Sequence, residues 1–202
     1  MKPGKFIVLE GIDGAGKSTQ ALMLRDYLKS KKIKVDSYWC PGGSEQGYKI
    51  RKLIMDGGLN DEACLLMFMA DMAQLQTEIK ESLNAGRWVI CDRYIPSFFA
   101  YHDHKFHDFV YTALKKLEFA IPDFVLYLIL DVYTAYDRME SRGDLSIFEK
   151  KGIEYMRNVQ EKYMKSPCVF AGEEIDANYE QTEVFAQIKR KLEKHFANEL
   201  KD

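Results

Sequence analysis

The sequence lacks the features that mark secreted, membrane-spanning and disordered proteins. Its four cysteines, Cys40, Cys64, Cys91 and Cys168, lie far apart and form no C-x-x-C pair, so we expect reduced thiols rather than a disulfide framework. No apolar run approaches the ~18 residues of a membrane span, and the run that follows Met1–Lys5 is too short for a signal peptide. We therefore expect a cytoplasmic protein that does not bind a membrane.

The sequence also has no large excess of positive or negative charge. The chain has 29 Lys and Arg against 31 Asp and Glu, a net charge of −2, so no basic field predicts a nucleic-acid partner. With 47% hydrophobic residues and only 5 prolines among 202 residues, the chain can bury a large core and contains no low-complexity segment. We expect one domain spanning residues 1–202, in which any anion-binding site is local.

Short apolar runs alternate with helical patterns along the chain. The expected strands are Lys5–Leu9, Ile33–Trp39, Trp88–Cys91, Phe124–Leu130 and a short strand around Ile175. Helical periodicity begins at Lys17 and returns over 45–55, 60–84 and 180–196. This alternation predicts the α/β class, with a largely parallel sheet of about five strands flanked by helices in three layers.

The longest expected helix has clear ends. Asn60 is a candidate N-cap followed by an acidic first turn, and the helix would run to Asn84 and end at Gly86. Its apolar stripe comprises Leu65, Phe68, Met72, Leu75 and Ile79. The sequence does not divide this stripe between the core and a subunit interface.

The polar segment Ser141–Lys150 has two open interpretations. It contains Arg142 and Gly143, so it could form an exposed, mobile excursion between helices. An ordinary connection between two helices is equally compatible with its composition.

A phosphate-binding motif lies at residues 11–18, which fit G-x-x-x-x-G-K-[ST] and follow an apolar strand directly before a helix. Its glycines let backbone amides converge on phosphate oxygens, Lys17 would reach the β- and γ-phosphates, and the Ser18 hydroxyl would bind Mg²⁺. The motif predicts a P-loop NTPase fold that binds ATP and Mg²⁺. The expected ATP-binding residues are Gly11, Ile12, Asp13, Gly14, Ala15, Gly16, Lys17, Ser18 and Thr19.

A second part of such a site follows the strand that begins at Trp88. This strand would deliver Asp92 beside the metal held by Ser18. The adjacent Arg93 could bind a phosphate through two hydrogen bonds, or it could form a salt bridge that orders the loop.

Several motifs together resemble the thymidylate kinases, a family of P-loop nucleoside monophosphate kinases. They are residues 6–20, Pro41-Gly42-Gly43 with Arg51, Leu66-Met-Phe68, Asp92-Arg93-Tyr94 and Arg142-Gly143-Asp144. The resemblance covers nearly the whole chain. It implies ATP-dependent phosphorylation of dTMP to dTDP by in-line transfer, in a homodimer whose lid spans about residues 141–150.

The resemblance also implies residue roles. Asp13 would lie near the sugar 3′-hydroxyl, Phe68 would stack on the acceptor base, and Tyr101 would crowd C2′. The remaining acceptor residues would be Arg51 and Arg93 around the phosphate, with Ser97, Asp71 and Met72. Arg138 would stack on adenine opposite the loop that contains Ala177. Lys17, Asp92, Arg93 and Arg142 would form the catalytic set. Phe68 and Tyr101 could instead be core aromatics, and Arg51 a solvated helix residue.

The lid departs from the family pattern. Gly14 stands where one subtype has a P-loop arginine, so the chain resembles the subtype that takes its cations from the lid. Arg142 would be the lid donor. The usual Asp-Arg before Phe-Glu is replaced by Ser146-Ile147, and Lys150 and Lys151 are the candidates to substitute for the missing cation.

The base site departs as well, because Met72 occupies the position of an arginine that hydrogen-bonds thymine. Helical spacing places Asp71 and Met72 nearest the base, and Phe98 makes the pocket more apolar. Losing such a charged hydrogen bond costs roughly 1.5–3 kcal/mol. Asp71 could accept a hydrogen bond from an amino or hydroxymethyl group of another pyrimidine, or Gln74 or Gln76 could read thymine.

Three other functions compete with this interpretation. They are a kinase for another or modified deoxypyrimidine monophosphate, a non-catalytic nucleotide-binding module, and a nucleic-acid-dependent ATPase, which the missing basic stripe disfavours. The cluster of His102, His104 and His107 could bind a metal, but we expect a solvated loop.

Overall fold

A computed structural model describes residues 3–141, 143, 145–165, 170 and 172–200. In these residues one sheet of parallel strands has the order β2-β3-β1-β4-β5. The strands are β1 (Phe6–Glu10), β2 (Val35–Trp39), β3 (Trp88–Asp92), β4 (Phe124–Ile129) and β5 (Gly172–Asp176). The predicted α/β class and parallel five-stranded sheet are thus confirmed.

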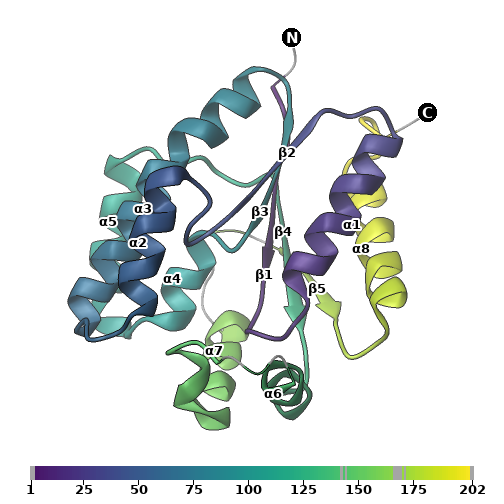
Figure 1. Cartoon of the computed structure of the whole chain (residues 1–202). Coiled ribbons are helices and arrows are strands. Elements are labelled where there is room, and N and C mark those ends of the chain that lie inside the picture. Colours follow the sequence, from purple (N-terminus) through teal and green to yellow (C-terminus); the bar gives the residue numbers. More distant parts are fainter. Residues whose placement is uncertain (1–2, 142, 144, 166–169, 171, 201–202) are drawn as a thin grey trace.

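Helices cover both faces of this sheet. They are α1 (Lys17–Ser30), α2 (Glu45–Met55), α3 (Asp61–Asn84), α4 (Ile95–Tyr101), α5 (His107–Lys116), α6 (Val132–Glu140), α7 (Ile153–Lys165) and α8 (Gln181–His195), with 3₁₀ turns at His104–Phe106 and Glu149–Lys151. Helices α1 and α8 lie on one face, α2 to α5 lie on the other, and α6 and α7 lie near the carboxyl ends of the strands (Figure 1). This arrangement is the expected three-layer fold.

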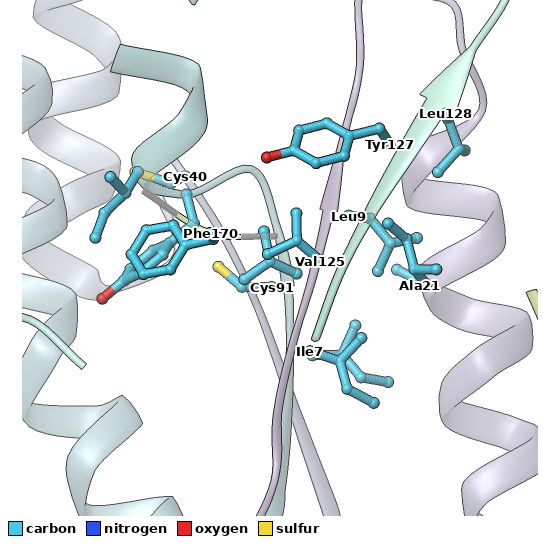
Figure 2. Close-up of a cluster of buried hydrophobic side chains, with 14 of the residues drawn as sticks. Ile7, Leu9, Ala21, Cys40, Cys91, Val125, Tyr127, Leu128 and Phe170 are labelled. Carbon is cyan, nitrogen blue, oxygen red and sulfur yellow. The ribbon is translucent and has the colours of Figure 1, made fainter. Parts of the chain in front are cut away.

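The central strands are apolar along their length because both of their faces are covered. Every residue of β1 is buried. Figure 2 shows Ile7, Leu9 and Leu128 on the side of Ala21 from α1, with Cys91 and Val125 on the other side. The hydrophobic run in the sequence therefore reflects helices on both sides.

The predicted long helix matches α3, because the Asn60 side chain accepts a hydrogen bond from Ala63 N (2.8 Å) and Gly86 has a φ of 73°. The strand expected from Ile33 begins at Val35. No bounds were predicted for helices α4 to α7, although α5, α6 and α7 are amphipathic. Among the described residues, no helix is both long enough and apolar enough to cross a membrane.

Candidate active site

A cleft of ≈ 1320 Å³ crosses the carboxyl ends of the strands, where ligands bind in open parallel sheets. One end is lined by residues 13–20, Arg138, Ala177 and residues 179–181. The other end is lined by residues 39–42, Arg51, Phe68, Met72, Phe98, Tyr101 and residues 145–150. Asp92 and Arg93 line the same cleft. The structure therefore brings the two predicted nucleotide sites into one continuous space.

Two glycines of the loop after β1 are required by close packing. Gly11 has a φ of 144°, and a Cβ there would lie 2.5 Å from the carbonyl oxygen of Leu128. Gly14 has a φ of 81°, and its Cβ would lie 2.5 Å from the carbonyl oxygen of Ala135 on α6. A side chain at position 14 would thus meet backbone, which is a structural reason for glycine at this position.

Lys17 begins α1 and is 6% exposed. Its ammonium group donates a hydrogen bond to the carbonyl oxygen of Ile12 (2.8 Å). Burial, with a smaller effect of Arg93, lowers the pKa of Lys17 to about 8, although neighbouring carboxylates oppose the shift. This lysine is therefore a partly desolvated charge facing the cleft, suited to a polyphosphate.

Ser18 and Asp92 are joined as the sequence predicts. The Ser18 hydroxyl donates to Asp92 Oδ2 (2.5 Å). Asp92 Oδ1 is buried and has no hydrogen-bond partner within the described part of the chain. A hydroxyl beside a carboxylate with a spare buried oxygen fits Mg²⁺, which binds oxygen ligands. Thr19 lines the cleft next to this pair.

Arg93 follows β3 with a φ of 70° and connects three segments. Its guanidinium donates to the carbonyl oxygen of Gly11 (2.9 Å), Asp13 Oδ1 (2.6 Å) and Tyr163 Oη (3.1 Å). It also lies over the Tyr101 ring, 4.9 Å from the centroid. The salt-bridge alternative is therefore present, on a guanidinium that also lines the cleft.

A buried carboxylate behind Arg93 went unnoticed in the sequence. Glu10 is fully buried and accepts hydrogen bonds from Tyr94 N (2.7 Å), Ser97 Oγ (2.8 Å) and Tyr163 Oη (3.0 Å). Burial raises the pKa of Glu10, whereas Arg93 and these hydrogen bonds lower it. The predicted residue Ser97 thus lines the cleft while bound to Glu10. Tyr163 gave no signal because α7 was not predicted.

Aromatic side chains dominate the other end of the cleft. The Phe68 ring lies 5.7 Å from His102 and 5.8 Å from Phe148, and Tyr101 lies 6.1 Å from Phe148. Tyr101 also donates a long hydrogen bond to Asp13 Oδ2 (3.4 Å). Phe68 and Tyr101 pack against the core and also line the cleft, so neither is solely a core residue.

The wall near Phe68 is apolar. Met72 is 2% exposed and Phe98 is 3% exposed, and both line the cleft. His102 lines it too, and burial lowers the pKa of His102 to about 4, so its imidazole is neutral. The expectation of a solvated histidine loop is therefore wrong for His102. Among the described residues, no group of three or more His, Cys, Asp or Glu side chains could hold a metal ion.

Asp71 is placed differently from the expectation that it faces the base. It is 1% exposed, is absent from the residues that line the cleft, and accepts hydrogen bonds from Cys40 Sγ (2.9 Å) and Gly42 N (3.0 Å). Gln76, a proposed thymine reader, instead donates to Met72 O (3.2 Å) and accepts from Tyr94 Oη and Ala120 N. Gln74 is exposed and lies outside the cleft wall. Successive residues of a helix point in directions about 100° apart, so Asp71 lies behind the cleft wall although its neighbour Met72 forms part of that wall.

Three further predicted residues line the cleft. Arg51 on α2 donates to the carbonyl oxygen of Pro41 (3.0 Å), so it is tied to the loop beside it. Arg138 on α6 makes a long hydrogen bond to the carbonyl oxygen of Gly14 (3.4 Å). Ala177 is buried and donates to Ile129 O (2.8 Å), which fixes the loop after β5.

Residues 145–150, the described part of the segment predicted to be a lid, line the end of the cleft that contains Phe68 and Tyr101. Phe148 is 9% exposed, and Ser146 N donates to Glu149 Oε2 (2.6 Å), so residues 145–149 are not an exposed excursion. Lys150 lines the cleft, whereas the ammonium of Lys151 lies over the rings of Phe148 and Tyr155, 5.4 and 4.8 Å from the centroids. Arg142 and Asp144 lie outside the described residues.

The known proteins to which this chain is similar are thymidylate kinases. A family model described as thymidylate kinase matches residues 9–188. A thymidylate kinase of Thermosipho africanus is 38% identical, covering 94% of this chain and 98% of that protein. One of Carboxydothermus hydrogenoformans is 33% identical, over 94% and 97%. A probable thymidylate kinase of Methanococcus aeolicus is 37% identical, over 79% and 78%.

Proposed function

Because this chain belongs to the thymidylate kinase family, we propose that it transfers the γ-phosphoryl group of ATP to the 5′-phosphate of dTMP and forms dTDP. The observation that carries this proposal is the continuity of the cleft. It runs from the loop at Lys17, past Arg93, to Phe68 and Tyr101. A kinase needs two phosphorylated ligands end to end, and one continuous cleft supports that arrangement.

Phosphoryl transfer with a loose transition state needs positioning and charge neutralisation more than a side-chain nucleophile. Lys17 binds the β- and γ-phosphates of ATP. Arg93 lies between the two sites and binds the acceptor phosphate, whose oxygen attacks the γ-phosphorus of ATP, exchanging hydrogen bonds to Gly11 O and Asp13 for phosphate oxygens. Both charges are largely shielded from water, which strengthens their interaction with transferring phosphate oxygens.

Ser18 and Asp92 would hold Mg²⁺, and the unpartnered Oδ1 of Asp92 supports this assignment. When bound, the ion neutralises charge on the β- and γ-phosphate oxygens. The contribution of the protein is to hold the Ser18 hydroxyl and the Asp92 carboxylate next to each other.

The adenine and acceptor subsites follow the cleft. Arg138 and the loop at Ala177 flank adenine. Phe68 stacks on the acceptor base, Arg51 supports the acceptor phosphate, Asp13 lies near the sugar, and Tyr101 excludes ribose. Residues 141–150 act as the lid, with Arg142 or Lys150 as its cation. We also propose that the enzyme is a cytoplasmic homodimer of single-domain subunits.

A second acceptor is favoured by a specific observation. Met72 and Phe98 make the base wall apolar, and Gln76 is already engaged within the protein. Another or modified deoxypyrimidine monophosphate would lose less than thymidylate from the missing charged donor.

The test is ADP release by the full chain with MgATP and dTMP, dUMP, dCMP or a 5-hydroxymethyl pyrimidine monophosphate. The highest kcat/KM with dTMP supports the first proposal, and dTMP as the poorest acceptor supports the second. ATP binding without turnover of any acceptor would overturn both and indicate a non-catalytic nucleotide-binding module.

A further inference from the structure

A buried carboxylate lies behind the acceptor end of the cleft. Asp71 projects from α3, and its two oxygens accept hydrogen bonds from the same loop, one from the Cys40 thiol (2.9 Å) and one from the Gly42 amide (3.0 Å). Cys40 and Gly42 line the cleft, whereas Asp71 does not. The carboxylate is therefore an interior partner of groups that themselves face the ligand.

The same carboxylate touches α2. A Cβ at Gly47 would clash with Asp71 Oδ1, so the backbone of the first turn of α2 packs directly on Asp71. The Ser44 side chain caps this turn by accepting from Gly47 N (3.0 Å). Loop, cap and helix start thus meet around one side chain.

Arg51 lies one helical turn after Gly47 and reaches back to the same loop. It donates to the carbonyl oxygen of Pro41 (3.0 Å), and a Cβ at Gly42 would lie 2.8 Å from Arg51 Cδ. The loop held by Asp71 therefore fixes the position of the Arg51 side chain.

We propose that Asp71, together with the Cys40 thiol, is a positioning residue that holds the Cys40–Gly42 loop and, through it, Arg51 in the acceptor site. The proposal rests on the kinase function proposed above, because it takes this end of the cleft as the monophosphate site. It gives Asp71 no contact with the base.

The chemistry of the pair fits this role. Burial raises the pKa of Asp71, while the hydrogen bonds from Cys40 and Gly42 and the charge of Arg51 act in the opposite direction. A buried carboxylate is tolerated when donors satisfy its oxygens, and it then restrains those donors strongly. Removing one of these hydrogen-bond donors leaves an Asp71 oxygen unpaired but does not alter the end of the cleft proposed to bind ATP.

The main test is Asp71→Asn in the full chain. The amide keeps the shape but turns an NH2 group toward a donor, so we expect the KM for dTMP to rise about tenfold, the scale of one disrupted charged hydrogen bond. The KM for ATP should change less than about twofold. The ratio of kcat/KM values among dTMP, dUMP and dCMP should stay constant, because Asp71 does not read the base.

Cysteine variants test the pair without altering the carboxylate. Cys40→Ala removes the thiol donor and should raise the dTMP KM in the same direction, whereas Cys40→Ser restores a donor and should recover most of the loss. The matched control is Cys64→Ala, which removes a half-buried thiol on α3 outside the cleft wall and should leave both KM values unchanged. If Asp71→Asn does not fold, the comparison of Cys40→Ala with Cys40→Ser carries the test.

Three results would overturn the proposal. A changed preference among the bases in Asp71→Asn would make Asp71 a base-contacting residue. Equal rises in the KM values for dTMP and ATP would indicate general destabilisation. Unchanged kinetics in Asp71→Asn or Cys40→Ala would show that the Asp71–Cys40 hydrogen bond does not position the acceptor site. Failure of the proposed function is distinguishable, because the wild-type chain would then turn over no monophosphate.

Discussion

The two ends of the cleft are built in different ways. The end proposed to bind ATP, the donor end, is mostly one continuous stretch, residues 13–20, in which glycine conformations and the start of α1 present the backbone. The acceptor end is assembled from the loop after β2, three helices and the lid, and its wall consists of side chains. A binding site made of contiguous backbone can therefore be predicted from the sequence, whereas a site made of side chains from separate elements can be predicted only in part.

The largest expected effect breaks the donor end. Lys17→Ala should lower kcat by about a hundredfold or more with every acceptor, because it removes a preorganised charge from the transferring phosphates. The measurement is ADP release with dTMP and dCMP in parallel. Lys29→Ala, which removes an exposed lysine from the same helix, is the control and should be silent. Undiminished turnover by Lys17→Ala would refute the phosphate-binding assignment.

A smaller effect is confined to the acceptor end. Met72→Arg restores a donor at the base wall and should lower the KM for dTMP about tenfold, the scale of one charged hydrogen bond, with no change in the KM for ATP. Ala70→Arg adds the same charge on an exposed side of α3 and serves as the control. A weaker affinity for dTMP in Met72→Arg would mean that the base does not lie against Met72.

The junction between the two ends depends on a hydroxyl. Tyr163 Oη contacts Arg93, Ser97 and Glu10, so Tyr163→Phe keeps the ring but removes one of the hydrogen bonds of Arg93. We expect kcat to fall about fivefold, on the order of one hydrogen bond. Tyr155→Phe is matched, because the Tyr155 hydroxyl is buried on the same helix without a hydrogen-bond partner among the described residues. Equal losses in the two variants would remove Tyr163 from the account.

The smallest expected effect is a pH dependence of the donor end alone. Lys17 is protonated below a pKa of about 8 and neutral above it, and a polyphosphate favours the protonated form. ATP affinity measured by calorimetry should therefore be about twofold weaker at pH 8 than at pH 7 and fall further at higher pH. Lys17→Arg, which stays charged, should abolish this dependence. A flat profile in the wild-type chain would contradict the lowered pKa.

Prediction from the sequence was most accurate where the rules are local. The bounds of α2 and the Asn60 cap of α3 follow from residues within a few positions of one another. The Ser18–Asp92 contact was also predictable, since parallel strands deliver their carboxyl ends to one edge of the sheet. Helix α4 has only 7 residues, and a helix this short owes its stability to tertiary packing.

The errors at the acceptor end have a common cause. Asp71 and Met72 are neighbours, yet a residue advances about 100° around a helix, so one lines the cleft and the other lies behind its wall. His102 was expected in a solvated loop, but the rings of Phe68 and Phe98 lie beside it and remove it from water. Hydrophobic periodicity predicts which residues share one face of a helix, but it does not predict which other elements cover that face.

The sequence by itself determined the phosphate-binding loop, the five strands and the ends of α3, because each depends on residue types and spacings within a short stretch. Only the tertiary structure decided that Glu10 and Tyr163 support Arg93 and that Asp71 holds the loop at Cys40. Those contacts join residues 31 to 153 positions apart. Their partners are chosen by how helices pack on the sheet, which no local pattern records.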